Sequence, residues 1–143
     1  MLFRSLFLRH PWALHVATGR PPLGPGLMRK YELELRAVDG LGLPEVLMDL
    51  LITVVNGFVR GTVGGVQEKA DAERLTGTTE DEWWAATEPY VAQVFDAERF
   101  PTAARVGPIA GEELGAYDPH RSFEFGLDRL LDGIGVLVLD ASG

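Results

Sequence analysis

Residues 10–26, HPWALHVATGRPPLGPG, carry the two side chains best suited to chemistry, His15 and Arg20, among apolar neighbours. An imidazole can bind a metal ion or line a pocket, and a guanidinium can anchor a polar group of a ligand. The prolines and glycines that follow Arg20 predict a rigid turn. A lone histidine is more often a hydrogen-bonded structural residue than a ligand, so both interpretations of His15 stay open on this evidence.

No pattern in the sequence predicts catalysis. The acidic runs at 80–82 and 112–113 are typical of helix starts and solvated faces, and no two histidines have metal-pair spacing. The stretch GLGLPE at 40–45 lacks the third glycine and the preceding strand of a dinucleotide-binding loop. The motifs G-x-S-x-G and H-E-x-x-H do not occur. We therefore predict no enzyme activity, no catalytic residue, no metal site and no cofactor.

The composition excludes several classes of protein. With 21 acidic and 13 basic residues, the net charge of −8 repels phosphate backbones, so this chain should not bind DNA by itself. The absence of cysteine excludes disulfides and zinc–thiolate sites and suits a bacterial cytoplasmic protein. The longest apolar run, at 50–55, is far shorter than the roughly 20 residues of a membrane helix, so we expect no membrane span and no export signal.

The first five residues, MLFRS, match what the tail of a common short-read sequencing adapter encodes when it is translated from a GTG start codon. We expect residues 1–5 to be a non-native start on a truncated gene, followed by one domain over 6–143. The length of 143 residues is that of a single domain. A natural start codon before Leu6 in a clean genomic sequence would contradict this expectation.

The chemistry-bearing residues must be positioned by helices, because apolar residues recur at intervals of three and four along most of the chain. We predict an all-α bundle with a long, mostly apolar central helix from Pro44 and an amphipathic C-terminal helix. A strand at 135–139 is the one local alternative, and 107–120 is predicted to be a loop. The predicted helices cover residues 2–9, 11–19, 27–38, 44–66, 80–95, 101–106 and 123–139.

Three segments together resemble one family. HPW at 10–12 with TGRPPLGPG at 18–26, NGFVRG at 56–61 and FEFGLDRLLDGI at 123–134 are similar to the C-terminal regulatory domain of TetR-type transcriptional regulators, of the tetracycline-repressor-like class. The resemblance implies a homodimeric, ligand-sensing domain of a bacterial repressor. In that family a separate N-terminal helix-turn-helix module binds operator DNA, and ligand capture releases the DNA. We expect that module to be missing from this chain.

The resemblance also implies a dimer interface built from two helices of each subunit, here the end of the central helix and the C-terminal helix. Glycines on both helices would allow close helix contact. The alternative is that these apolar stripes pack inside one subunit. The predicted interface residues are Gly61, Gly65, Phe123, Leu127, Leu130, Leu131 and Ile134.

In tetracycline-responsive members a histidine before an Arg-Pro turn helps to bind a metal-chelated drug, and His15 is at the corresponding place. Here Gly19 makes the spacing one residue longer, and residues 62–66 of the central helix supply no acidic metal partner. We therefore predict no metal–tetracycline chelate, but an apolar or aromatic effector anchored by His15 or Arg20. The predicted pocket residues are Trp12, His15, Arg20, Met28, Tyr31, Phe58 and Trp84.

Two other functions remain as alternatives. A stand-alone helical interaction module that acts through mixed dimers would have a genuine start near Met1 and no upstream helix-turn-helix. A small all-α enzyme would need a polar cluster that the sequence does not display. The sequence does not identify the effector, the operator or the sign of regulation.

Overall fold

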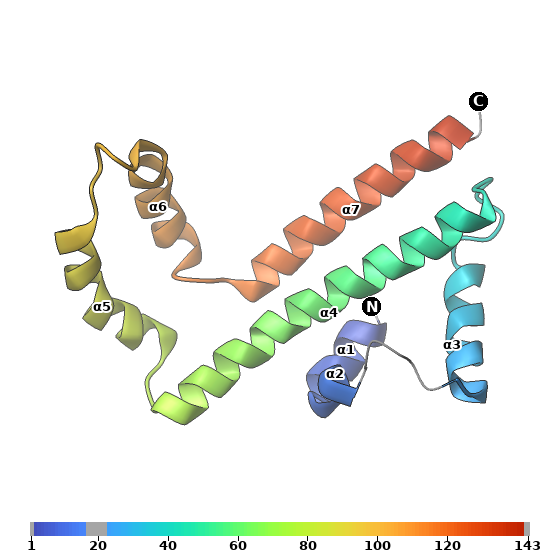
Figure 1. Cartoon of the computed structure of the whole chain (residues 1–143), viewed down its shortest axis with the longest axis horizontal. Coiled ribbons are helices and arrows are strands. Elements are labelled where there is room, and N and C mark those ends of the chain that lie inside the picture. The colour runs from blue at the N-terminus through green and yellow to red at the C-terminus, as the bar shows by residue number, and fades with distance from the viewer. Residues whose placement is uncertain (1, 17–22, 142–143) are drawn as a thin grey trace. The chain divides into compact units, whose positions relative to one another are not determined.

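The computed structural model of the protein describes residues 2–16 and 23–141. Within these ranges the chain is all-α, as predicted, and no residue lies in a strand. The segment at 135–139, for which the sequence also allowed a strand, is helical. The helices are α1 (Leu2–Arg9), α2 (Trp12–Val16), α3 (Pro25–Arg36), α4 (Glu45–Thr76), α5 (Glu80–Val94), α6 (Pro101–Leu114) and α7 (Pro119–Ala141) (Figure 1).

The chain forms two compact units. The first unit comprises Met1–Gly64 and Ser122–Gly143, and therefore contains α1, α2, α3, the first part of α4 and most of α7. The second unit comprises Gly65–Arg121 and contains the end of α4 together with α5 and α6.

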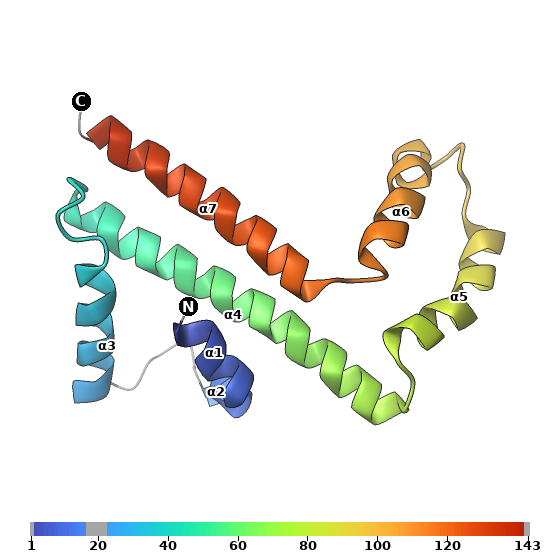
Figure 2. The same cartoon turned by 180° about the vertical axis from the view of Figure 1, so that it is seen from behind.

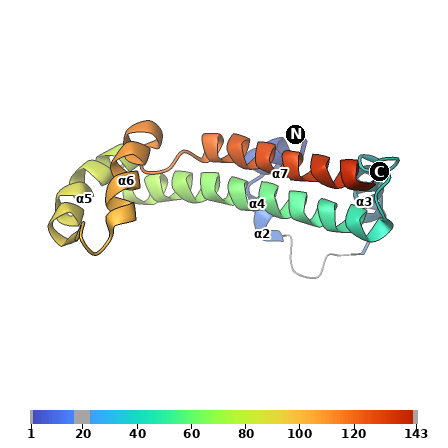
Figure 3. The ribbon, with the colours of Figure 1, turned by 90° about the horizontal axis from the view of Figure 1, so that it is seen from above.

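In the first unit, α7 runs antiparallel to α4 and alongside it (Figures 1 and 3). The rings of Phe58 on α4 and Phe123 on α7 stack with their centroids 5.5 Å apart and their planes 26° apart. Phe123 is only 3% exposed, and Leu51 and Val63 of α4 are buried too. The apolar face that the sequence predicted for the C-terminal helix therefore packs on the central helix of the same chain.

Helix α1 is held in the first unit by two contacts between a cation and an aromatic ring. The guanidinium carbon of Arg4 lies 4.7 Å from the centre of the Phe123 ring, and the ammonium of Lys30 lies 4.9 Å from the centre of the Phe3 ring. Such contacts contribute about 0.5–1 kcal/mol each where they are exposed. Arg4 and Phe3 belong to the five residues that the sequence analysis expects to be non-native, and both lie within α1.

In the second unit, α5 begins as the sequence predicted. The hydroxyl of Thr79 accepts the backbone N–H of Glu82 at 3.3 Å, and the Glu82 carboxylate accepts the backbone N–H of Thr79 at 2.9 Å. This reciprocal pair is a capping box, which satisfies two amide groups that a helix start otherwise leaves without partners. The predicted helix at 80–95 ends at Val94.

Helix α6 is longer than predicted. The sequence predicts a helix that ends at Val106, followed by a loop over 107–120. In the structure α6 continues through Leu114, with Pro108 inside it. The prediction was wrong for 107–114 because Gly107 and Pro108 were taken as a helix end. Ile109 and Leu114 continue the helical spacing of Val106, and the bend or break expected at a proline is tolerated in this exposed helix.

Among the described residues, helix α4 is long and apolar enough to cross a membrane, by length and composition only. The expectation of no span rests on the uninterrupted apolar run at 50–55, which is much shorter than α4 itself. The same test is passed by long helices of helical bundles. The polar side chains Asp49 and Asn56 of α4 bond to α3.

Candidate functional site

The predicted pocket residues of α2 lie on the surface of the first unit. Trp12 is 64% exposed and meets the edge of the His10 ring, with the two centroids 6.1 Å apart. His15, the fourth residue of this short helix, is exposed as well. Arg20, the other predicted polar anchor, lies outside the residues that the structure describes.

The predicted pocket residues of α3 lie one turn apart, beside α4. Met28 is 53% exposed and Tyr31 is 37% exposed. The Tyr31 hydroxyl donates a hydrogen bond to Oδ1 of Asp49, on α4, at 2.7 Å. This bond to a carboxylate raises the pKa of Tyr31, because deprotonation would remove the donor and place two negative charges together.

A second polar contact joins the same two helices one turn further along α3. The Asn56 side-chain amide donates to Oε1 of Glu34 at 3.1 Å, and the ammonium of Lys30 contacts the same carboxylate at 2.6 Å. Asp49 and Asn56 are seven residues apart on α4 and therefore lie on one face of it. We name the four residues Tyr31, Asp49, Glu34 and Asn56 the polar seam, which joins α3 to α4. Figure 2 shows α3 standing at an angle to α4.

The polar seam includes three residues that the sequence analysis did not predict. The available signal was that Asp49 and Asn56 interrupt the apolar surface of the central helix on both sides of the run at 50–55. A polar group on such a helix needs a hydrogen-bond partner. The partner residues on α3 have no distinguishing pattern, so the sequence alone could not pair them.

The remaining predicted pocket residues, Phe58 and Trp84, belong to different units. Phe58 is half-buried in the first unit and packs against Phe123. Trp84 is 39% exposed on α5 in the second unit, with its ring centroid 6.2 Å from that of Trp83. The part of the predicted pocket that the structure brings together is therefore the surface of α3 and α4 around Tyr31.

The two glycines predicted for the dimer interface have different surroundings in one chain. A Cβ atom added at Gly61 would meet no other atom within 4 Å, whereas a Cβ atom added at Gly65 would lie 2.7 Å from the Tyr117 hydroxyl. A side chain at position 65 would therefore require the Tyr117 ring to shift within the second unit. Of these two glycines, Gly61 is the one with free space around it, into which another helix could pack.

The predicted interface residues of α7 also divide into two groups. Phe123 is buried, and half-buried positions follow it at Leu127, Leu130 and Ile134, on the face that packs on α4. Leu131 is 52% exposed. The uncovered apolar side chains of the first unit also include Val46, Leu50 and Val54 of α4 and Phe125, Val136 and Leu139 of α7, all more than half exposed.

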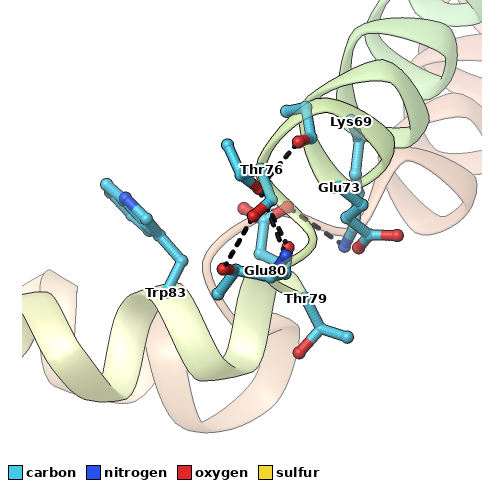
Figure 4. A pocket seen from close by; sticks show the side chains of 8 residues that line it. Lys69, Glu73, Thr76, Thr79, Glu80 and Trp83 are labelled. Atoms are coloured by element: carbon cyan, nitrogen blue, oxygen red, sulfur yellow. Dashed lines mark hydrogen bonds and ion pairs between the residues drawn. The ribbon is translucent and has the colours of Figure 1, made fainter.

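Two hollows lie in the second unit. The smaller hollow, of about 260 Å³, lies between the end of α4 and the start of α5. In it the ammonium of Lys69 pairs with Oε2 of Glu80 at 3.3 Å, and Trp83 stands further along α5 (Figure 4). The larger hollow, of about 420 Å³, is lined by Val66, Lys69, Ala70, Glu73, Leu114, Tyr117, Asp118, Pro119 and His120. None of the predicted pocket residues lines either hollow.

Within the described residues, no three acidic, histidine or cysteine side chains gather closely enough to hold a metal ion. The polar groups around Tyr31 are two carboxylates, an amide and a phenol, which can donate to and accept from an organic ligand. The geometry therefore offers recognition through hydrogen bonds and apolar contact.

Known proteins share this sequence pattern. The sequence model of the family described as "Tetracyclin repressor-like, C-terminal domain" matches residues 2–138. The chain is 35% identical over 139 residues to the HTH-type transcriptional repressor DrrR1 of Streptomyces coeruleorubidus. The aligned region covers 97% of this chain and 50% of that protein. The chain thus spans about half the length of that curated relative.

A shorter similarity, 34% identity over 90 residues, relates the chain to the Holliday junction branch migration complex subunit RuvB of Limosilactobacillus reuteri (strain DSM 20016). It covers 63% of this chain and 25% of that protein, so it shows no common family. The family pattern, in contrast, extends over nearly the whole chain and agrees with its all-helical structure. The chain therefore belongs to the tetracycline-repressor-like C-terminal domain family of TetR-type transcriptional regulators.

Proposed function

We propose that this chain is the effector-binding and homodimerisation domain of a bacterial TetR-like transcriptional repressor. The observation that carries the proposal is the family match over residues 2–138, together with a relative that is a transcriptional repressor. A helix-turn-helix module outside this chain binds the operator, and effector binding here releases it. The domain performs no catalysis and acts in the cytoplasm.

The dimer part of the proposal is supported by the uncovered apolar side chains of α4 and α7. A chain of this size that exposes Leu50, Val54 and Phe125 by more than half leaves apolar surface that a second copy would remove from water. Gly61 has free space on the same helix as Leu50 and Val54. We therefore assign the interface to Gly61, Leu131 and these exposed side chains. Phe123 and the half-buried positions of α7 pack on α4 of the same chain and hold α7 in place.

The effector part is supported by the position of the predicted pocket residues. Trp12, Met28 and Tyr31 are exposed apolar or aromatic side chains of the first unit, and the polar seam supplies hydrogen-bonding groups among them. An apolar or aromatic molecule with a polar substituent matches this chemistry. A ligand relieves operator binding only if it binds the two conformations of the repressor with different affinity.

The effector assignment is tested by a thermal-shift screen of aromatic compounds against the parent chain and the variants His15→Ala and Arg20→Ala. A ligand that binds only the folded state raises the melting temperature, and loss of an anchor reduces that shift. Arg36→Ala serves as a matched control, because Arg36 belongs neither to the predicted pocket nor to either hollow. Unchanged shifts in both anchor variants would overturn the assignment of His15 and Arg20.

The regulatory assignment is tested at the level of the gene. The nucleotide sequence upstream of the Leu6 codon should encode roughly 70–90 further residues with a helix-turn-helix pattern. A natural start codon at Met1, with no such pattern upstream, would favour an interaction module that acts through mixed dimers.

A further inference from the structure

The larger hollow of the second unit contains a carboxylate that the proposed effector site does not use. Glu73 lines this hollow from α4 and is half-buried. Among the described residues, none donates a hydrogen bond to the Glu73 carboxylate or forms an ion pair with it. A cation bound in the hollow would give this carboxylate an ion-pair partner.

The only lysine that lines the hollow does not serve as that partner. The Lys69 ammonium lies 3.3 Å from Oε2 of Glu80 and donates to the backbone oxygen of Tyr117 at 3.3 Å. Figure 4 shows Lys69 extending from α4 toward Glu80, while the carboxylate of Glu73 points away from Trp83. Glu80 thus balances the charge of Lys69 and leaves Glu73 unbalanced.

A second carboxylate, that of Asp118, lines the same hollow. Its Oδ1 accepts the backbone N–H groups of His120 and Arg121, each at 3.0 Å. These bonds, that of Arg121 first, lower the pKa of Asp118, so it stays ionised at neutral pH. The larger hollow therefore carries two negative charges and one lysine that is already paired.

The rest of the wall consists of the imidazole of His120 and of apolar groups, with Val66, Ala70, Leu114, Tyr117 and Pro119 around the charged side chains. Its volume of about 420 Å³ is within the range of small-molecule sites, which extends from roughly 300 to 1,000 Å³. An inorganic cation would leave this apolar wall without a contact.

We propose that the larger hollow binds a small organic cation, an ammonium group on an apolar body, with Glu73 as the anionic anchor and Asp118 as a second source of negative potential. This site lies wholly within the second unit. It is separate from the effector residues assigned to the first unit and does not depend on that assignment.

The test uses the full chain and the probe phenethylamine, which is a cation at neutral pH, with phenethyl alcohol as its neutral counterpart. Dissociation constants are measured by NMR titration. Glu73→Gln should weaken phenethylamine binding by about tenfold and leave phenethyl alcohol binding unchanged. The matched control Glu68→Gln removes the same charge from an exposed position of α4 that lines neither hollow, and should change the affinity by less than about twofold.

A second pair of variants locates the apolar body of the ligand. Leu114→Ala should weaken both compounds, because Leu114 lines the hollow, whereas Ile109→Ala on the exposed side of α6 should weaken neither. Equal phenethylamine affinity for the parent and Glu73→Gln would overturn the proposal. Equal loss in Glu73→Gln and Glu68→Gln would also overturn it, since it would indicate a general effect of net charge.

Discussion

The ring of Phe58 occupies the space that a side chain at position 126 would need. A Cβ atom added to Gly126 would lie 2.5 Å from Cε2 and 2.8 Å from Cζ of Phe58. The Phe58 ring cannot retreat freely, because it stacks on the buried ring of Phe123. We therefore expect Gly126→Ala to lower the free energy of unfolding by about 1–3 kcal/mol, as overpacking does in other cores. Urea denaturation at a fixed protein concentration measures this change.

The control for this prediction is Gly133→Ala on the same helix. A Cβ atom at Gly133 meets nothing within 4 Å, so the gain in helix propensity should stabilise this variant by up to about 1 kcal/mol. Combining Gly126→Ala with Phe58→Leu should cost less than the sum of the two single changes, because the clash is removed. Equal stability of Gly126→Ala and Gly133→Ala would show that the ring moves aside.

The hydrogen bond between Tyr31 and Asp49 should make the stability of the fold depend on pH in the alkaline range. The pKa of Tyr31 is raised above its ordinary value of about 10, so its contribution to stability is complete below pH 10 and is lost as the pH rises through the folded-state value. Tyr31→Phe should remove this part of the alkaline loss. Spectroscopic titration of tyrosinate in the parent and in Asp49→Asn, where the pKa should return toward its ordinary value, provides the check. An unchanged titration in Asp49→Asn would contradict the hydrogen bond.

The capping box of α5 predicts a pH dependence at the acidic end. The backbone N–H of Thr79 lowers the pKa of Glu82, so the stabilisation is present above the ordinary value of about 4.5 and is lost as the pH falls through the folded-state value. Thr79→Ala should cost about 1 kcal/mol of stability in α5. Circular dichroism as a function of pH measures both effects. Asp81→Asn is the control, because Asp81 is in the same first turn but outside the capping box.

A larger side chain at position 61 should weaken the proposed dimer. Because a side chain at this position has free space within one chain, Gly61→Leu should fold normally but block the close approach of a second helix. The dimer dissociation constant from sedimentation equilibrium should rise by about tenfold or more. Gly111→Leu, at an equally open position of α6, should leave it unchanged. Equal dissociation constants for the two variants would place the interface elsewhere.

The helices could be predicted from the sequence where apolar spacing and capping residues agreed. Thr79 with Glu82 identified the start of α5, and the spacing of apolar residues identified α7. The helix prediction was wrong at Pro108, which lies inside α6 instead of ending it. Local rules treat such a residue as a helix end, although the apolar spacing continues beyond it.

The arrangement of the predicted site could be predicted only in part. The pocket around Tyr31 stays a prediction, and the bond of Tyr31 to Asp49 depends on the tertiary packing of α3 and α4. Phe58 and Phe123 were assigned to two different functions, yet they contact each other. A period of 3.6 residues identifies an apolar face but does not distinguish contact within a chain from contact between chains.

Each of the two helices α5 and α6 contains an internal proline, Pro89 and Pro108, and neither helix contains a buried residue. A proline has no amide hydrogen, so the backbone oxygens of Ala85 and Ala104 lose their usual helical donors. With few buried contacts to oppose opening, these helices should open locally at a much lower free energy than the buried part of α4. Their amides should therefore exchange with deuterium long before those around Val63, and the second unit would be the part of the domain most easily reshaped by whatever binds it.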